Sequence, residues 1–252
     1  MATPMSTRRP VVQVRDLVVR YPTGRRAVDK VSFTVPAGGV LGLLGRNGAG
    51  KSTTMKVLAG ALRPSAGVAL VGGHDLGTPA GADLARGLLG YSPSPTGLVP
   101  MLTVRECIGL ALAGHGLGAR WPDALALAER LDVAGVLDER TATFSHGMAR
   151  RVSVLIAVLT SSSLLLLDEP FDGVDAVGAR VVCELVGEAS RAGVAVVIST
   201  HLLDLATEVC DQVAVMSAGR IVSASAAAHL AGRRGAARYE RLLAGAAERA
   251  AA

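Results

Sequence analysis

Residues 45–52 combine three closely spaced glycines with one lysine and one serine, in the order Gly-Arg-Asn-Gly-Ala-Gly-Lys-Ser. This order matches G-x-x-x-x-G-K-S/T, a loop whose glycines let successive backbone N–H groups turn toward an anion. We expect a buried strand before the loop and a helix after it, so that the positive end of the helix adds to the anion site. The pattern predicts a loop for the phosphates of a nucleotide, in which Lys51 reaches the β- and γ-phosphates and Ser52 ligates Mg²⁺. The predicted nucleotide-binding residues are Gly45, Arg46, Asn47, Gly48, Ala49, Gly50, Lys51, Ser52 and Thr53, although Thr53 and Thr54 can also pack or cap within the helix.

An acidic pair, Asp168-Glu169, supplies the second half of a phosphoryl site. It follows the run Leu164–Leu167, which is expected as a buried strand. A strand that ends in two acids can place the first beside a metal ion and the second near the γ-phosphate, where it polarises an attacking water. We therefore predict Asp168 as a metal ligand and Glu169 as a general base, an arrangement typical of a hydrolase.

The segments that must position these residues predict an α/β core. Val11–Val19 and Val31–Val35 alternate apolar and polar residues, which is typical of half-buried strands in an antiparallel sheet. Helices are expected from near Lys51, Gly178 and Leu202, with right-handed crossovers between the strands. Four shorter runs are apolar on both faces, as in a covered parallel sheet: Val40–Leu44, Leu164–Leu167, Val194–Ile198 and Val213–Met216.

Residues 93–145 differ in sequence pattern from the strand-forming segments on either side, and they predict a helical insertion in this core. Thr103 and Glu106 have the spacing of a capping box that opens an apolar run. A second helix is expected from Pro122. At the end of the chain, apolar residues recur with helical spacing, so the tail is predicted as one amphipathic helix packed on the core; these residues are Tyr239, Leu242, Leu243 and Ala246.

With both halves of the phosphoryl site placed, the chain from about Val11 to Leu230 resembles the ATPase subunit of an ATP-binding cassette (ABC) transporter. Further motifs of that family follow in order: Tyr21 as the aromatic residue that stacks on adenine, Phe144-Ser145-His146-Gly147-Met148 as the signature, Gly173-Val174-Asp175 as the D-loop and His201 as the switch histidine. The resemblance implies an α/β fold: a P-loop NTPase core with a mainly parallel sheet, a small antiparallel N-terminal β subdomain and an inserted helical subdomain. Residues 1–92 and 146–230 would form the two parts of the ATP-binding core, 93–145 the helical subdomain and 231–252 a short helical tail.

The same resemblance implies how the site works. ATP and Mg²⁺ would lie between the phosphate loop of one subunit and Ser145 and Gly147 of a second, in a head-to-tail dimer of like or unlike subunits. Asp175 would couple the two sites, His201 would contact the γ-phosphate and Glu169 would be the general base. The helical subdomain would dock on an integral membrane permease, which places the chain in the cytoplasm, peripheral on the inner face of the cell membrane. The signature and the residues before the D-loop look most like those of the exporter branch for drugs or peptides.

The amino-acid composition disfavours several kinds of partner and location for this chain. The 26 Lys and Arg residues exceed the 21 Asp and Glu by five, but they are scattered in pairs such as Arg25-Arg26 and Arg150-Arg151, which we expect on a solvated surface. With three Phe, three Tyr and one Trp, the chain has little material for base stacking, so no nucleic-acid partner is expected. Neither an apolar leader near the N-terminus nor a run of about 18 apolar residues is present. Three separated cysteines fit buried thiols in a reducing compartment.

Two positions depart from the family's pattern. Ser94 stands where a glutamine is usual, and its hydroxyl is too short to reach the same metal or water; either it acts through a water, or the site turns over more slowly or couples differently to the permease. His146 replaces the usual second glycine of the signature and adds a Cβ and a ring. A second hypothesis is therefore a degenerate nucleotide-binding partner of a competent sister subunit. A third, an ABC ATPase acting on DNA or ribosomes, is disfavoured by the single cassette and the absence of heptads.

Overall fold

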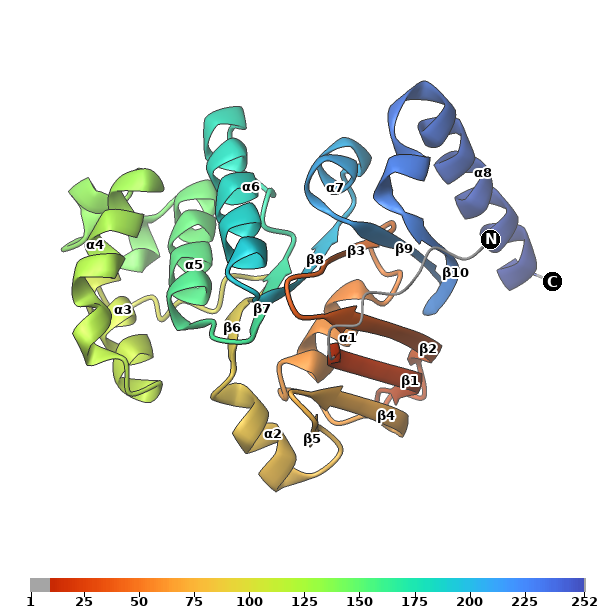
Figure 1. Ribbon diagram of the computed structural model, residues 1–252, viewed down its shortest axis with the longest axis horizontal. Coiled ribbons are helices and arrows are strands. Elements are labelled where there is room, and N and C mark those ends of the chain that lie inside the picture. The colour runs from red at the N-terminus through yellow and green to blue at the C-terminus, as the bar shows by residue number, and fades with distance from the viewer. Residues whose placement is uncertain (1–9, 252) are drawn as a thin grey trace.

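Two sheets and the helices around them make up the molecule (Figure 1). The computed structural model describes residues 10–251. The expectation about an N-terminal leader concerns residues 1–9, which lie outside the described residues; of the predicted helical tail, 231–252, only residue 252 lies outside them.

The smaller sheet has four antiparallel strands in the order β2-β1-β4-β5. Its strands are β1 (Pro10–Arg20), β2 (Arg26–Pro36), β4 (Ala66–Val71) and β5 (His74–Asp75). Val12 pairs with Val35 and Val14 with Phe33 across β1 and β2. The alternating segments of the sequence thus form the antiparallel N-terminal sheet that was expected.

The larger sheet has six strands in the order β10-β9-β3-β8-β7-β6, and only the edge strand β10 runs antiparallel to its neighbour. Alternate residues of β3 belong to opposite hydrophobic clusters, Val40 and Leu44 to one and Leu41 and Leu43 to the other. Both faces of the sheet are therefore covered, which is why its strands are continuous apolar runs. The strands are β3 (Val40–Leu44), β6 (Leu89–Ser92), β7 (Leu164–Asp168), β8 (Ala195–Thr200), β9 (Gln212–Ser217) and β10 (Arg220–Ala226).

Eight α-helices are assigned within residues 10–251: α1 (Lys51–Leu58), α2 (Pro79–Arg86), α3 (Val104–Gly114), α4 (Trp121–Arg130), α5 (His146–Thr160), α6 (Ala176–Arg191), α7 (Leu203–Val209) and α8 (Gly232–Ala251). Helices α3 and α4 lie at one end of the molecule and pack on α5 (Figure 1). Both hydrogen bonds of the capping box are present: Thr103 N donates to Glu106 Oε2 at 2.8 Å, and Glu106 N to Thr103 Oγ1 at 3.2 Å.

Sequence patterns located most of these elements to within two residues. Helix α4 begins one residue before Pro122, and α6 begins two residues before Gly178 because Asp175 caps it. Five elements were not predicted, namely β4, β5, α2, β6 and β10; they are short or rich in Ala, Gly and Ser. No helix within the described residues is both long and apolar enough to cross a membrane.

Two finer expectations were wrong. Cys183 is only half-buried, whereas Cys107 and Cys210 are buried as expected. Arg150 was expected on a solvated surface, yet its side chain is completely buried, because α5 places it between the loop that follows β6 and the end of β7.

Candidate active site

The phosphate loop joins the buried strand β3 to α1, and two of its glycines stand where a side chain would not fit. A Cβ on Gly45 would lie 2.3 Å from the carbonyl oxygen of Met216. Gly50 has a φ of 106°, and a Cβ there would lie 2.6 Å from the carbonyl oxygen of Ala27. The loop is thus pressed against neighbouring backbone, which holds it in the curled form that an anion requires.

Lys51 begins α1, and its side chain folds back over the loop. Its Nζ donates to the carbonyl oxygens of Gly45 at 2.7 Å and Arg46 at 3.3 Å. The same ammonium lies 3.0 Å from Oε1 of Glu169, with the lysine side chain only 5% exposed. The cation is therefore fixed at the centre of the loop, where its charge faces a carboxylate.

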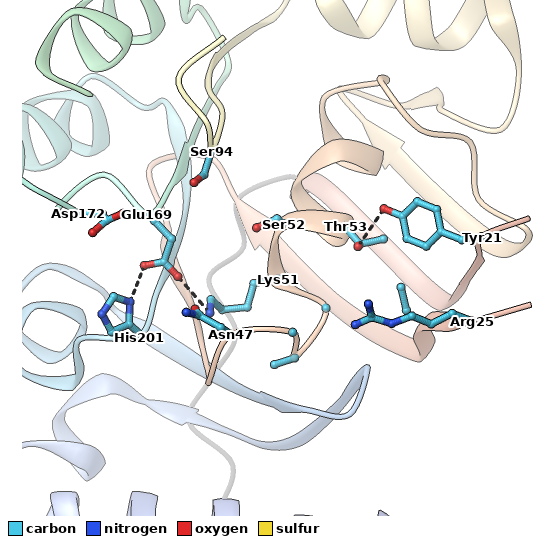
Figure 2. A pocket seen from close by; sticks show the side chains of 14 residues that line it. Tyr21, Arg25, Asn47, Lys51, Ser52, Thr53, Ser94, Glu169, Asp172 and His201 are labelled. Carbon is cyan, nitrogen blue, oxygen red and sulfur yellow. Dashed lines mark hydrogen bonds and ion pairs between the residues drawn. The ribbon is translucent and has the colours of Figure 1, made fainter. Parts of the chain in front are cut away.

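Glu169 lies between two partners at the end of β7. Its Oε1 faces Lys51, and its Oε2 lies 3.0 Å from Nδ1 of His201, which follows β8 (Figure 2). The backbone N–H of Glu169 donates to the carbonyl oxygen of Ser199 at 3.0 Å and to its hydroxyl at 3.1 Å, and the residue has a φ of 51°. A positive φ at a residue with a side chain is uncommon, and here these contacts hold it.

Asp168 and Ser52 form the part of the site that can hold a metal ion. Ser52 Oγ donates to Asp168 Oδ1 at 3.1 Å, and the hydroxyl of Ser199 donates to the same oxygen. Asp168 Oδ2 is buried without a hydrogen-bond partner, and burial raises the pKa of this carboxyl. A hard cation takes oxygen ligands of this kind, and Mg²⁺ typically uses one or two protein oxygens together with phosphates and waters. The pair fits Mg²⁺ in that mode, although within residues 10–251 no cluster of three or more His, Cys, Asp or Glu could hold a metal by itself.

A cleft of about 620 Å³ opens over the phosphate loop. Tyr21 stands at one end, where its hydroxyl lies 3.3 Å from Oγ1 of Thr53, and Glu169 and His201 form the opposite wall (Figure 2). The structure thus brings together predicted residues from four separate segments. The predicted site residues that line the cleft are Tyr21, Asn47, Gly48, Ala49, Gly50, Lys51, Ser52, Thr53, Glu169 and His201.

Three lining residues were not predicted: Arg25, Ala27 and Asp172. Arg25 belongs to the same turn as Tyr21, since the backbone N–H of Tyr21 donates to the carbonyl oxygen of Arg25 at 2.9 Å. Ser94, the departure from the family pattern, also lines the cleft (Figure 2).

The signature and D-loop residues do not line this cleft; they pack on one another instead. Ser145 caps α5, its Oγ accepting from the backbone N–H of Met148 at 3.2 Å. A Cβ on Gly147 would lie 2.2 Å from the carbonyl oxygen of Gly173. Asp175 Oδ1 accepts from the backbone N–H of Gly178 at 2.7 Å, and Oδ2 lies 2.7 Å from Arg151. Within one chain these residues are structural, and the roles expected for them across a dimer stay a prediction.

Comparisons with known proteins agree with this geometry. The family model described as "ABC transporter" matches residues 28–172. The chain is 37% identical over 210 residues to the daunorubicin/doxorubicin resistance ATP-binding protein DrrA of Streptomyces peucetius, covering 82% of this chain and 62% of that protein. It is 37% identical over 217 residues to the mouse retinal-specific phospholipid-transporting ATPase ABCA4, covering 84% of this chain but 9% of that protein.

A solved structure, an ATP-binding subunit of an ABC transporter, superposes with a TM-score of 0.84 at 29% identity and covers 92% of this chain and 99% of its own. The chain thus spans less than two thirds of the curated relatives that it matches, but nearly the whole of a solved ATP-binding subunit. It belongs to the ABC transporter family and has the fold of that family's ATPase domain.

Proposed function

We propose that this chain binds ATP with Mg²⁺ in the cleft over its phosphate loop, hydrolyses it, and so powers a separate integral membrane permease. The observation that carries the proposal is the carboxylate of Glu169, held between Lys51 and His201 on the wall of that cleft. A nucleotide-binding loop alone would support binding; a fixed carboxylate beside it supports hydrolysis.

In this mechanism each residue of the wall has a separate task. Lys51 exchanges its contact with Glu169 for the β- and γ-phosphates when ATP enters. Glu169 then accepts the proton of a water aligned on the γ-phosphate, and His201 keeps the carboxylate oriented through its contact with Oε2. Mg²⁺, held by Ser52 and Asp168, would neutralise phosphate charge when bound. Tyr21 offers its ring to the adenine.

The assembly that we propose follows the family. Residues 146–230 and 1–92 form the ATP-binding core, and residues 93–145 the helical subdomain, a division that falls between the end of β6 and the start of α5. The helical subdomain presents exposed apolar side chains, Val99, Met101 and Leu110, to a permease. A second ATPase subunit, like or unlike, supplies Ser145, Gly147 and Asp175 to each nucleotide. The chain would therefore work in the cytoplasm, on the inner face of the cell membrane.

Export of a drug-like or peptide substrate is the proposed direction. The similarity to DrrA, whose name describes drug resistance, supports it, as do the signature and D-loop segments.

One observation favours a second candidate, the degenerate partner in a heterodimer. Ser94 lines the cleft at the position of the family's usual glutamine, and its Oγ is engaged at 3.4 Å by Arg150. In that case the chain would bind ATP and hydrolyse little of it.

Mg-ATP turnover by the purified chain, alone and with its candidate permease in detergent, separates the two. We expect turnover that requires Mg²⁺ and is abolished in Glu169→Gln. The Lys51→Ala variant should lose nucleotide binding. Tight ATP binding without turnover in the native chain would overturn the proposal in favour of the degenerate partner. Native turnover in Glu169→Gln would overturn the assignment of the base.

A further inference from the structure

Arg150 is a buried cation in the first turns of α5, and its hydrogen bonds go to three residues in two separate segments. Its Nη1 donates to the carbonyl oxygen of Pro93 at 2.6 Å and to that of Asp168 at 3.1 Å. Its Nη2 lies 3.4 Å from Oγ of Ser94. Its side chain is fully buried, and burial lowers the pKa of the guanidinium, so the cation stands in a costly environment. Because burying this charge is costly, we expect the side chain of Arg150 to do more than fill space.

The two segments that it joins, the end of β7 and the loop after β6, are those on which the chemistry depends. Asp168 ends β7 and precedes Glu169, while Pro93 and Ser94 begin the loop that leads from β6 into the helical subdomain. One turn further along α5, Ser153 Oγ contacts Ser92 Oγ at 2.8 Å and donates to the carbonyl oxygen of Thr96 at 3.0 Å. Two side chains on one face of α5 therefore hold this loop, but only Arg150 also contacts the strand end that carries the acids.

We propose that Arg150 is a positioning residue for ATP hydrolysis: its guanidinium locks the loop at Pro93-Ser94 to the end of β7, and so fixes Asp168 and Glu169 relative to the phosphate loop. The planar guanidinium suits this task because one nitrogen serves two carbonyl oxygens while the other reaches a hydroxyl. Through Arg150, a movement of the helical subdomain is then transmitted directly to the end of β7 that carries Asp168 and Glu169. This inference rests on the proposed function only for its effect on turnover.

The variants that test it are Arg150→Met, which keeps the length and removes every donor, and Arg150→Lys, which keeps the charge. Arg130→Met is the matched control, since Arg130 pairs with Glu188 on the outside of the molecule. The nucleotide-free chains are compared by hydrogen exchange over residues 91–97 and 168–172. ATP affinity is measured with a fluorescent methylanthraniloyl ATP in EDTA, and kcat and KM at saturating Mg²⁺.

In Arg150→Met we expect faster exchange in those two segments and unchanged exchange in α4 and α6. Displacement of catalytic groups by about 1 Å can cost roughly a hundredfold in rate, so kcat should fall by about tenfold to a hundredfold. KM and the ATP affinity in EDTA should stay within about twofold, because Lys51 and the loop glycines do not contact Arg150. Arg150→Lys should recover part of kcat, and the control should match the native chain.

Uniformly faster exchange with weaker ATP binding would show that Arg150 is only structural, and unchanged exchange and kcat in Arg150→Met would equally overturn the proposal. If the native chain itself fails to hydrolyse ATP, the proposed function fails, whereas the exchange measurement on the nucleotide-free chain still decides whether Arg150 holds the two segments together.

Discussion

Replacing Glu169 by glutamine should change ATP binding and ATP turnover in opposite directions. Oε1 of Glu169 lies 3.0 Å from Lys51 Nζ, and the two side chains are 13% and 5% exposed. The contact is an ion pair and not a hydrogen bond, since Oε1 of Glu169 has no hydrogen-bond partner; such a pair contributes up to about 1 kcal/mol, most of which the neutral amide of glutamine gives up. If about 1 kcal/mol is released, Lys51 becomes available to phosphate and the Kd for ATP falls roughly fivefold. Loss of the general base should lower kcat by about a hundredfold or more.

The assay is equilibrium titration with a fluorescent ATP analogue in EDTA, followed by single-turnover hydrolysis with Mg²⁺. Asp172→Asn is the matched control, because Asp172 lines the same cleft but pairs with His146 rather than Lys51. It should leave the Kd for ATP within about twofold of the native value. Weaker or unchanged ATP binding in Glu169→Gln would refute the competition between the carboxylate and the phosphates for Lys51.

Three further outcomes follow from single contacts. Tyr21→Ala should weaken ATP binding by about 1–3 kcal/mol through lost stacking on adenine, while binding of inorganic tripolyphosphate, measured by competition, stays the same. Gly147→Ala places a Cβ 2.2 Å from the carbonyl oxygen of Gly173 and should lower the free energy of unfolding in urea by about 1–3 kcal/mol; Gly109→Ala, in open space on α3, should not. The N–H of Gly178, and then Arg151, hold the pKa of Asp175 below its usual range, so its stabilisation is present above the unfolded pKa of about 3.9 and is lost as pH falls through the folded pKa. Asp175→Asn should therefore lower Tm at pH 7, and the deficit should shrink below about pH 4.

The phosphate loop and the acidic pair could be predicted because their chemistry admits few residue types at fixed spacing. Only glycine fits at Gly45 and Gly50, where neighbouring backbone lies too close for a Cβ, and the end of β7 holds Asp168 beside Ser52. The fold class followed from the same logic, since strands covered on both faces must be apolar on both faces.

The residues that were missed have no such pattern. Arg25 and Asp172 belong to the cleft because a turn and a strand end meet there in three dimensions. Arg150 looked like half of a surface pair, since its burial depends on a loop more than fifty residues away in sequence. Charge and spacing along the chain carry no information about such a contact. The edge strand β10 was not predicted for a different reason. Its residues are small and mostly half-buried or exposed, so no apolar run marks it.

His146 illustrates how a departure from the family pattern can be accommodated. Its Nε2 lies 3.1 Å from Oδ2 of Asp172, and its ring approaches Gly173, so the added side chain turns toward the D-loop of its own subunit. The N-terminus of α5 is left capped by Ser145, and Gly147 keeps the close packing that only a glycine allows. Asp172 also lines the nucleotide cleft of the same chain. The contact between His146 and Asp172 therefore connects the signature turn, which would face the partner's nucleotide, to the cleft for this chain's own nucleotide. In the proposed dimer, the substitution would thus add a contact between the two sites without removing the groups that the signature needs.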